Sequence, residues 1–141
     1  EFWSGAKYFQ GNRSPNSAQR EAEGYSVAWM HHKGRNRHHY EYWTDILPGT
    51  GKYGPVPMPR KYLAEMVMDR RAACMTYEGK NYTPASPLAY FSRSKERHFM
   101  HPQTAWELEF LLTMLKEKGE KETFAFIRST VLTGKPFAEE I

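Results

Sequence analysis

The sequence predicts an all-α fold, a single-domain bundle of about five to seven helices over residues 1–141. Apolar residues recur at spacings of three and four along most of the chain, as in helices that bury one face. No stretch shows a convincing alternation of apolar and polar residues, the pattern of a half-buried strand. Segments rich in glycine and proline separate the helical stretches, and the length suits one domain.

Three helical stretches are expected in the first third. Residues 1–10 carry aromatic residues at helical spacing, and a loop follows. A second helix is expected from Ser17, a suitable N-cap, to Gly34, because glycine commonly ends helices. A short helical piece is expected over residues 38–46. The second helix presents one face formed by Tyr25, Ala28, Trp29 and His32.

A long loop is expected over residues 47–59, because four prolines and three glycines disfavour any regular element. Helices then follow over residues 60–79, 86–95 and 102–118, the last two opened by prolines at the first helical position. Gly119 is expected to end the third of these helices and to precede a last helix. The stripe of the third helix is formed by Trp106, Phe110, Leu111 and Met114. Residues 120–132 form the last helix, with Phe124, Ile127 and Val131 pointing inward.

Composition limits the class of protein and its compartment. The formal net charge is +4, with a pI near 9.2, which permits phosphate-bearing partners without requiring them. The single cysteine, Cys74, excludes an intramolecular disulfide and a cysteine-based zinc site. No apolar run approaches the roughly 20 residues of a membrane span, and no signal peptide pattern is present, so a cytoplasmic protein is expected. The sequence opens at Glu1 without methionine, and we expect an N-terminally truncated fragment.

Histidines are concentrated in the segment HHKGRNRHHYEYW, which holds four of the six in the chain. Histidine is the side chain most often used to bind metals and to move protons near neutral pH. His32 continues an apolar face, so it should point toward the interior or a cleft, where both ring nitrogens need partners. A short turn could fold His38 or His39 back toward His32.

Two carboxylates form the second feature. Glu65 and Asp69 lie four residues apart on one predicted helix and therefore share a face. Their neighbours are apolar, and a carboxylate pair held near a core needs a cation. Imidazole nitrogen and carboxylate oxygen are a common ligand set for Zn, Mn, Fe or Ni. The two features together predict a divalent metal site whose open positions would lower the pKa of a bound water.

Each residue also has an ordinary structural interpretation. His32 can belong to a buried hydrogen-bond network, Lys61 can pair with Glu65, and Arg70 and Arg71 can serve other acids. Cations near the histidines could receive a phosphate group or a nucleic acid backbone. The alternative function is therefore a non-catalytic helical module that binds protein or nucleic acid through a basic loop. These cations are Lys33, Arg35, Arg37 and Lys52.

The motif A-W-x2-H-x3-N-x-H-H-x2-Y-W resembles a bacterial family of small helical proteins of uncharacterised function. In this chain the motif covers residues 28–43, and a second block, E-M-x2-D, covers residues 65–69. Residues 82–91 and 101–120 extend the likeness over nearly the whole chain. Sequences of this type sometimes carry the label catalase, but nothing in this chain points to a haem site.

More distantly, the arrangement is similar to HD-type metal-dependent phosphohydrolases, which implies hydrolysis of a nucleotide or another phosphate ester. Those enzymes place histidines, a His-Asp pair and a late aspartate around one or two metal ions. This chain has no His-Asp dipeptide, and a fragment would lack that part of the site and, with it, the ion. The implied metal ligands are His32, His38, His39 and Asp69. The implied catalytic residues are Glu65, as ligand or general base, and Asn36 and Arg35, which would orient phosphate.

Overall fold

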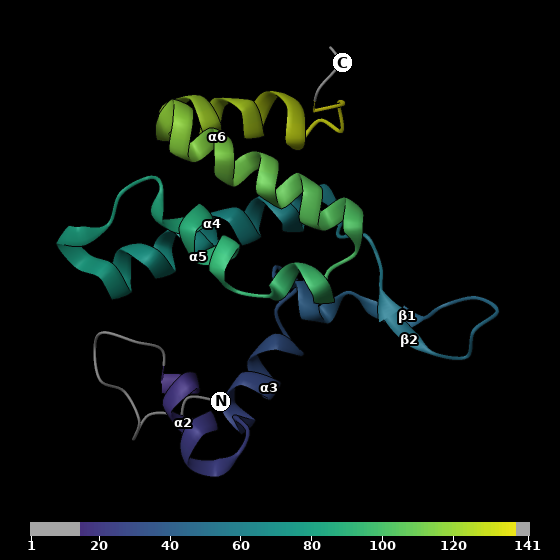
Figure 1. Ribbon diagram of the computed structural model, residues 1–141. Helices are drawn as coiled ribbons and strands as arrows, with labels where there is room; N and C mark the ends of the chain where they lie inside the picture. Colours follow the sequence, from purple (N-terminus) through teal and green to yellow (C-terminus); the bar gives the residue numbers. More distant parts are fainter. Residues whose placement is uncertain (1–14, 138–141) are drawn as a thin grey trace.

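The structure, a computed structural model, describes residues 15–137 and confirms the predicted helical class (Figure 1). The helix expected over residues 1–10 lies outside the described residues. None of the helices that are described is long and apolar enough to cross a membrane. The helices are α2 (Pro15–Glu23), α3 (Val27–Lys33), α4 (Arg60–Glu78), α5 (Ser86–Arg93) and α6 (Pro102–Phe126). Single helical turns occupy Tyr40–Tyr42, Gly79–Asn81, Glu96–Phe99 and, as a π-helical turn, Ile127–Val131.

The single helix expected from Ser17 to Gly34 is wrong, because two short helices replace it. Gly24 has a φ of +90°, a conformation that glycine adopts without the cost of a Cβ, and it separates α2 from α3. Ser26 then caps α3 by accepting a hydrogen bond from the Trp29 amide at 3.0 Å. Its hydroxyl also donates to the side-chain oxygen of the fully buried Gln19 at 2.6 Å, which joins the two helices. Tyr25 therefore lies in the connection and is exposed.

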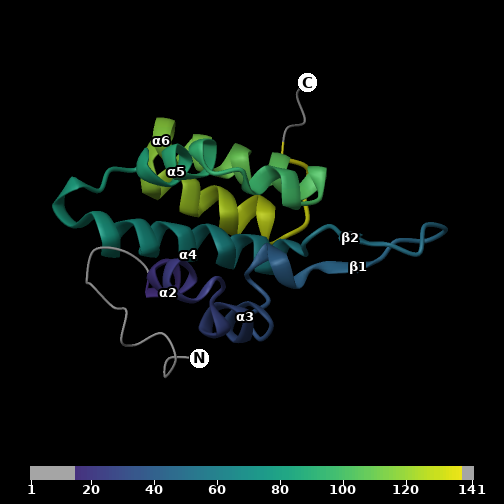
Figure 2. The same cartoon turned by 60° about the horizontal axis from the view of Figure 1, so that its bottom comes forward.

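The short helical piece expected over residues 38–46 is present as a single 3₁₀ turn, and the expectation of a structureless loop over residues 47–59 is wrong. A 3₁₀ turn is followed by an antiparallel pair of strands, β1 (Thr44–Ile46) and β2 (Tyr53–Pro55). Gly49 and Gly51 have φ values of +78° and +68°, so the glycines form the turn of a hairpin. The hairpin projects from the helical body (Figures 1 and 2).

Helix α4 runs through the middle of the molecule. Helices α2 and α3 lie on one side of it, and α5 and α6 lie on the other (Figures 1 and 2). The face that α6 buries differs from the predicted stripe, because Trp106 is 51% exposed and only Leu111 of that stripe is fully buried. The apolar residues of α6 that are completely buried are Leu108, Leu111, Leu112 and Leu115. On α4 the most buried residues are Leu63, Met66 and Val67.

The predicted break at Gly119 is confirmed. Its φ of 87° and ψ of 177° are not helical, and the chain reverses direction there (Figure 1). The two halves of α6 consequently lie antiparallel, and the second half corresponds to the predicted last helix. Ile127 and Val131 are buried, and Phe124 packs against the core, as predicted.

An ion pair connects α4 to the start of the second half of α6. The Nε of Arg71 donates to Glu120 Oε2 at 2.6 Å, and the Tyr82 hydroxyl donates to the same oxygen at 3.0 Å. The hydrogen bond from Arg71 holds the pKa of Glu120 below its usual value. Burial and the contact with Glu120 raise the pKa of Tyr82 to about 12. The bend at Gly119 is therefore held by charge as well as by packing.

Replacing Glu120 by glutamine should lower the free energy of unfolding at pH 7 by about 0.5–1 kcal/mol, the modest value of a partly exposed pair. A carboxylate with a lowered folded pKa stabilises the fold above its unfolded pKa, and this contribution is lost as the pH falls through the folded value. The difference between Glu120→Gln and the parent should therefore shrink toward zero in acid below about pH 4. Urea unfolding at several pH values measures it, with exposed Glu122→Gln as control. A difference independent of pH would contradict this assignment.

Candidate metal centre

The segment that follows α3 folds back on itself in consecutive turns. His32 lies in the last turn of that helix. The amide of Arg35 donates to the His32 carbonyl at 3.1 Å, and the amide of His39 donates to the Asn36 carbonyl at 3.2 Å. These two turns bring His38 and His39 beside His32, the approach that the sequence analysis considered for either of them.

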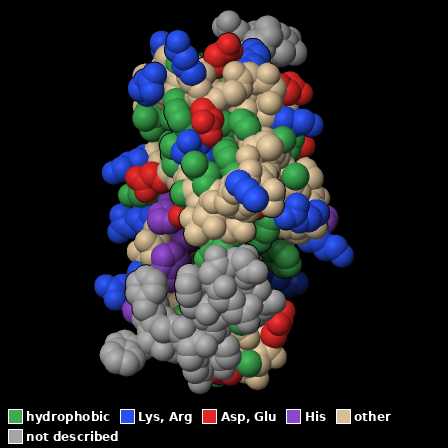
Figure 3. All heavy atoms as spheres, turned by 90° about the vertical axis from the view of Figure 1, so that its left-hand side faces the viewer, with side chains coloured by type: hydrophobic (Ala, Val, Ile, Leu, Met, Phe, Trp, Pro, Cys, Tyr) green, Lys and Arg blue, Asp and Glu red, His purple; other side chains and the backbone are tan. Residues whose placement is uncertain are grey.

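Three imidazoles meet at this point, those of His32, His38 and His39. One nitrogen from each lies within 4.8 Å of the nitrogens of the other two. The ring centroids are 4.8 Å apart for His32 and His39, 4.5 Å for His38 and His39, and 6.4 Å for His32 and His38. Within residues 15–137 no other set of three histidine, cysteine or acidic side chains is as close. Figure 3 shows histidine side chains gathered on one face, with lysine and arginine side chains around them.

His39 contributes a buried ring nitrogen to the group. Its Nε2 is shielded from solvent and has no hydrogen-bond partner among the described residues. Burial, together with the neighbouring His38, His32 and Arg70, lowers the pKa of His39 to about 3. The ring is therefore neutral near pH 7. A buried nitrogen without a protein partner calls for a ligand or water, and a neutral imidazole nitrogen is a common metal ligand.

His32 is held by Asn36. The Asn36 side-chain amide donates to the His32 carbonyl at 2.8 Å and lies 3.2 Å from His32 Nδ1. His31 is exposed, and its Nε2 lies 3.2 Å from the Arg35 guanidinium. Asn36 and Arg35, predicted to orient phosphate, thus each contact a histidine, and their predicted role stays a prediction.

The two predicted carboxylates, those of Asp69 and Glu65, differ in how close they lie to the histidines. Asp69 Oδ1 lies 3.7 Å from His38 Nε2, so α4 does bring this acid to the histidines. Its side chain is 48% exposed and lies outside the group of atoms within 4.8 Å of one another. Glu65 is exposed on the preceding turn, and none of the hydrogen bonds or ion pairs of the described residues joins it to an imidazole. The structure therefore places Asp69 next to His38, outside the group of three imidazoles, and leaves Glu65 apart.

Residues 1–114 match the model of a family of unknown function, DUF5662. The chain belongs to this family. The DUF5662 match includes every residue of the histidine group and Asp69, and it stops within the first half of α6. Comparison with curated proteins and with solved structures finds no match.

Beside the histidines, this DUF5662 chain carries a polar network that the sequence did not reveal. Arg70 donates two hydrogen bonds to Glu96, at 2.8 and 3.2 Å. Two further polar atoms in this network, Arg70 Nε and Glu41 Oε1, are buried without partners among the described residues. Burial raises the pKa of Glu41 and that of Tyr40. In the sequence, the feature that pointed to this network was the adjacent pair Arg70 and Arg71. As anticipated, each forms an ion pair with an acid that is distant in the sequence.

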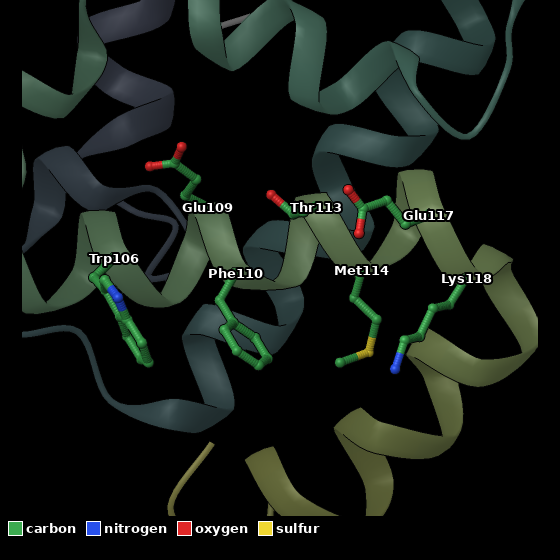
Figure 4. Close-up of a pocket in the computed structure, with 7 residues that line it drawn as sticks. All are labelled: Trp106, Glu109, Phe110, Thr113, Met114, Glu117 and Lys118. Atoms are coloured by element: carbon green, nitrogen blue, oxygen red, sulfur yellow. The ribbon is translucent and has the colours of Figure 1, made fainter. Parts of the chain in front are cut away.

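The groove of the DUF5662 chain shown in Figure 4 is elsewhere. It has a volume of about 330 Å³ and lies along the first half of α6. Trp106, Phe110 and Met114 point to one side of the helix, toward its second half, and Glu109 and Glu117 point to the other (Figure 4). No histidine or cysteine lines this groove. The histidine group offers metal ligands that this groove lacks, and we place the candidate site at the histidines.

Proposed function

We propose that this chain is a metal-dependent phosphohydrolase that acts on a nucleotide or another phosphate ester. His32, His38 and His39 would bind one divalent ion. The observation that supports the proposal is the mutual approach of three imidazole nitrogens to within 4.8 Å. Bond lengths of about 2.0–2.1 Å allow one ion to reach nitrogens at such spacing after small side-chain rotations.

The donor set favours particular metals. Imidazole suits Zn, Fe and Ni, whereas Mn would need the oxygen of Asp69 as well. Cys74, the single cysteine, is buried on α4 and is not part of the group, so thiolate ligation is not expected. Three protein ligands leave a coordination position for water or substrate, as in catalytic zinc sites.

The residues around the group would supply the remaining functions. A bound divalent ion acidifies water and withdraws charge from a phosphoryl oxygen. Asp69 and Glu65 occupy the exposed side of α4, from which a carboxylate could accept a proton. Arg35 and Asn36 remain our candidates for orienting phosphate. HD-type enzymes also use histidines and an aspartate around their metal. For this reason we extend the proposal to an HD-like relationship, in which the motif in residues 28–43 supplies the imidazoles.

Metal analysis and binding test the proposal first. Protein freed of metal by a chelator should bind about one equivalent of Zn²⁺, Co²⁺ or Ni²⁺, and His32→Ala should bind each much more weakly. His98→Ala, at an exposed histidine outside the group, is the matched control. Loaded protein should hydrolyse members of a panel of nitrophenyl phosphate esters and nucleotides. Failure to bind any of these ions would refute the metal centre. Binding without hydrolysis across the panel would refute the enzymatic part.

A further inference from the structure

We propose that Asp69 positions His38 and does not bind the ion, so that His38 binds it through Nδ1. The inference rests on the proposed metal centre and assigns a different role to the carboxylate that the sequence analysis placed among the ligands. It concerns which nitrogen of His38 faces the ion and what holds that ring in place.

The contact between the two side chains identifies the nitrogen. Asp69 Oδ1 lies 3.7 Å from Nε2 of His38, and the described residues give that ring no other polar contact. The two nitrogens of an imidazole lie on different sides of the ring, so a ring that turns Nε2 toward the carboxylate turns Nδ1 away from it. His38 is 22% exposed and Asp69 is 48% exposed, so the carboxylate lies on the solvent side. Nδ1 is then the nitrogen that can face the other imidazoles.

The position of Asp69 argues against direct ligation. Two atoms bound to one ion at about 2.0–2.2 Å lie no more than about 4.4 Å apart. Asp69 Oδ1 meets this limit with Nε2 of His38, at 3.7 Å, which is the nitrogen assigned above to the outside of the group. Asp69 approaches His38 alone, because its oxygens are outside the group in which every atom is within 4.8 Å of every other. Its helix cannot shift easily toward the histidines, since Leu63 and Val67 of α4 are completely buried in the core. The carboxylate can therefore reach the outer nitrogen of His38 without reaching the ion.

Different neighbours then position each of the three imidazoles. A ligating imidazole usually donates its second N–H to a carboxylate, carbonyl or water, which fixes its tautomer and increases its basicity. Asp69 would do this for His38. Asn36 contacts Nδ1 of His32, and His39 is held by burial, with the Trp29 ring edge-on at 4.9 Å. Removal of Asp69 should loosen one ligand and leave the other two unchanged.

Cobalt-substituted protein provides the test. The exchangeable imidazole N–H protons of cobalt-bound histidines give strongly shifted proton NMR signals. In Asp69→Ala we expect one of these signals to broaden by solvent exchange and the Co²⁺ affinity to fall by about 10–100-fold. The visible absorption of the cobalt ion should keep its shape, because the ligands are unchanged. Asp69→Asn retains an acceptor oxygen and should restore part of the affinity.

Controls separate this inference from the metal centre itself. Asp45→Ala removes an exposed aspartate on β1 and should leave affinity and spectra unchanged. A changed absorption spectrum in Asp69→Ala, with an altered number of bound ligands, would show that Asp69 binds the ion and would overturn the inference. Unchanged affinity together with an unchanged set of N–H signals would also overturn it. If the parent protein binds no cobalt, the metal centre has failed, whatever Asp69 does.

Discussion

Replacing His39 by alanine should reduce the affinity of the protein for Zn²⁺ or Co²⁺ by more than about 100-fold. Loss of an outer hydrogen-bond partner alone costs 10–100-fold, so loss of a ligand should cost more. His39 should also be the most sensitive of the three positions. Its Nε2 is buried without a partner among the described residues, and its low pKa means that it need not release a proton to bind. Competition with a chromophoric chelator measures the affinity.

The matched control for this prediction is His31→Ala. His31 lies in the same segment but is exposed, and its contact is with Arg35. This variant should bind metal within about threefold of the parent. Quenching of tryptophan emission by Co²⁺ gives a second readout, because Trp29 lies 4.9 Å from the His39 ring. Equal loss of affinity in the two variants would indicate a general effect of histidine content and would contradict the assigned site.

The meeting of the histidines could be predicted because it depends on local structure. His32 lies in the last turn of a helix that stops at Gly34, and His38 and His39 follow after two short turns, so sequence spacing limits how far apart the rings can lie. The helix that carries Asp69 was predictable because it is long and because Pro59 and Gly79 mark its two ends in the sequence. The partners of Asn36 and Arg35 were not predictable. A polar side chain of this kind takes whichever neighbouring group the turn presents, and that depends on backbone angles.

The errors in the predicted fold also occur where backbone angles or neighbouring helices determine the structure. Glycine and proline were interpreted as ending regular structure over residues 47–59, whereas Gly49 and Gly51 supply the positive φ values that close a hairpin. Gly24 sits within an otherwise periodic stretch, so its ability to break the helix was not evident. In α6, the predicted stripe included Trp106, which is exposed, and missed Leu108, Leu112 and Leu115, which are completely buried. Which of two apolar faces is buried depends on the neighbouring helices, and the sequence of one helix does not contain that information.

Arg70 connects the candidate site to the rest of the fold. Its side chain is 14% exposed, and the guanidinium donates to both oxygens of Glu96, whose side chain is 24% exposed. The same guanidinium lies 5.8 Å from the centre of the buried Phe91 ring. Ser94 adds a hydrogen bond to Glu96 at 3.1 Å. Arg70 therefore joins α4, beside the histidine group, to the segment between α5 and α6.

Replacing Arg70 by methionine should lower the free energy of unfolding by about 2–3 kcal/mol. Methionine keeps much of the apolar volume, so the loss comes mainly from two charge-assisted hydrogen bonds and from a carboxylate left poorly solvated. Partial exposure of both side chains keeps the value below that of a fully buried pair. Denaturant unfolding at pH 7 measures it. Arg93→Met, at an exposed arginine that stacks on Tyr90, should cost less than about 0.5 kcal/mol.

The double variant Arg70→Met with Glu96→Gln separates the pair from its surroundings. If the two side chains stabilise the fold mainly through each other, the double variant should be more stable than the sum of the single effects predicts, by about 1–2 kcal/mol. Additive losses would mean that Arg70 acts through other partners, with Glu41 the first candidate, because Arg70 lowers the pKa of that buried carboxyl while burial raises it. In that case a triple variant carrying Glu41→Gln should recover the missing coupling energy.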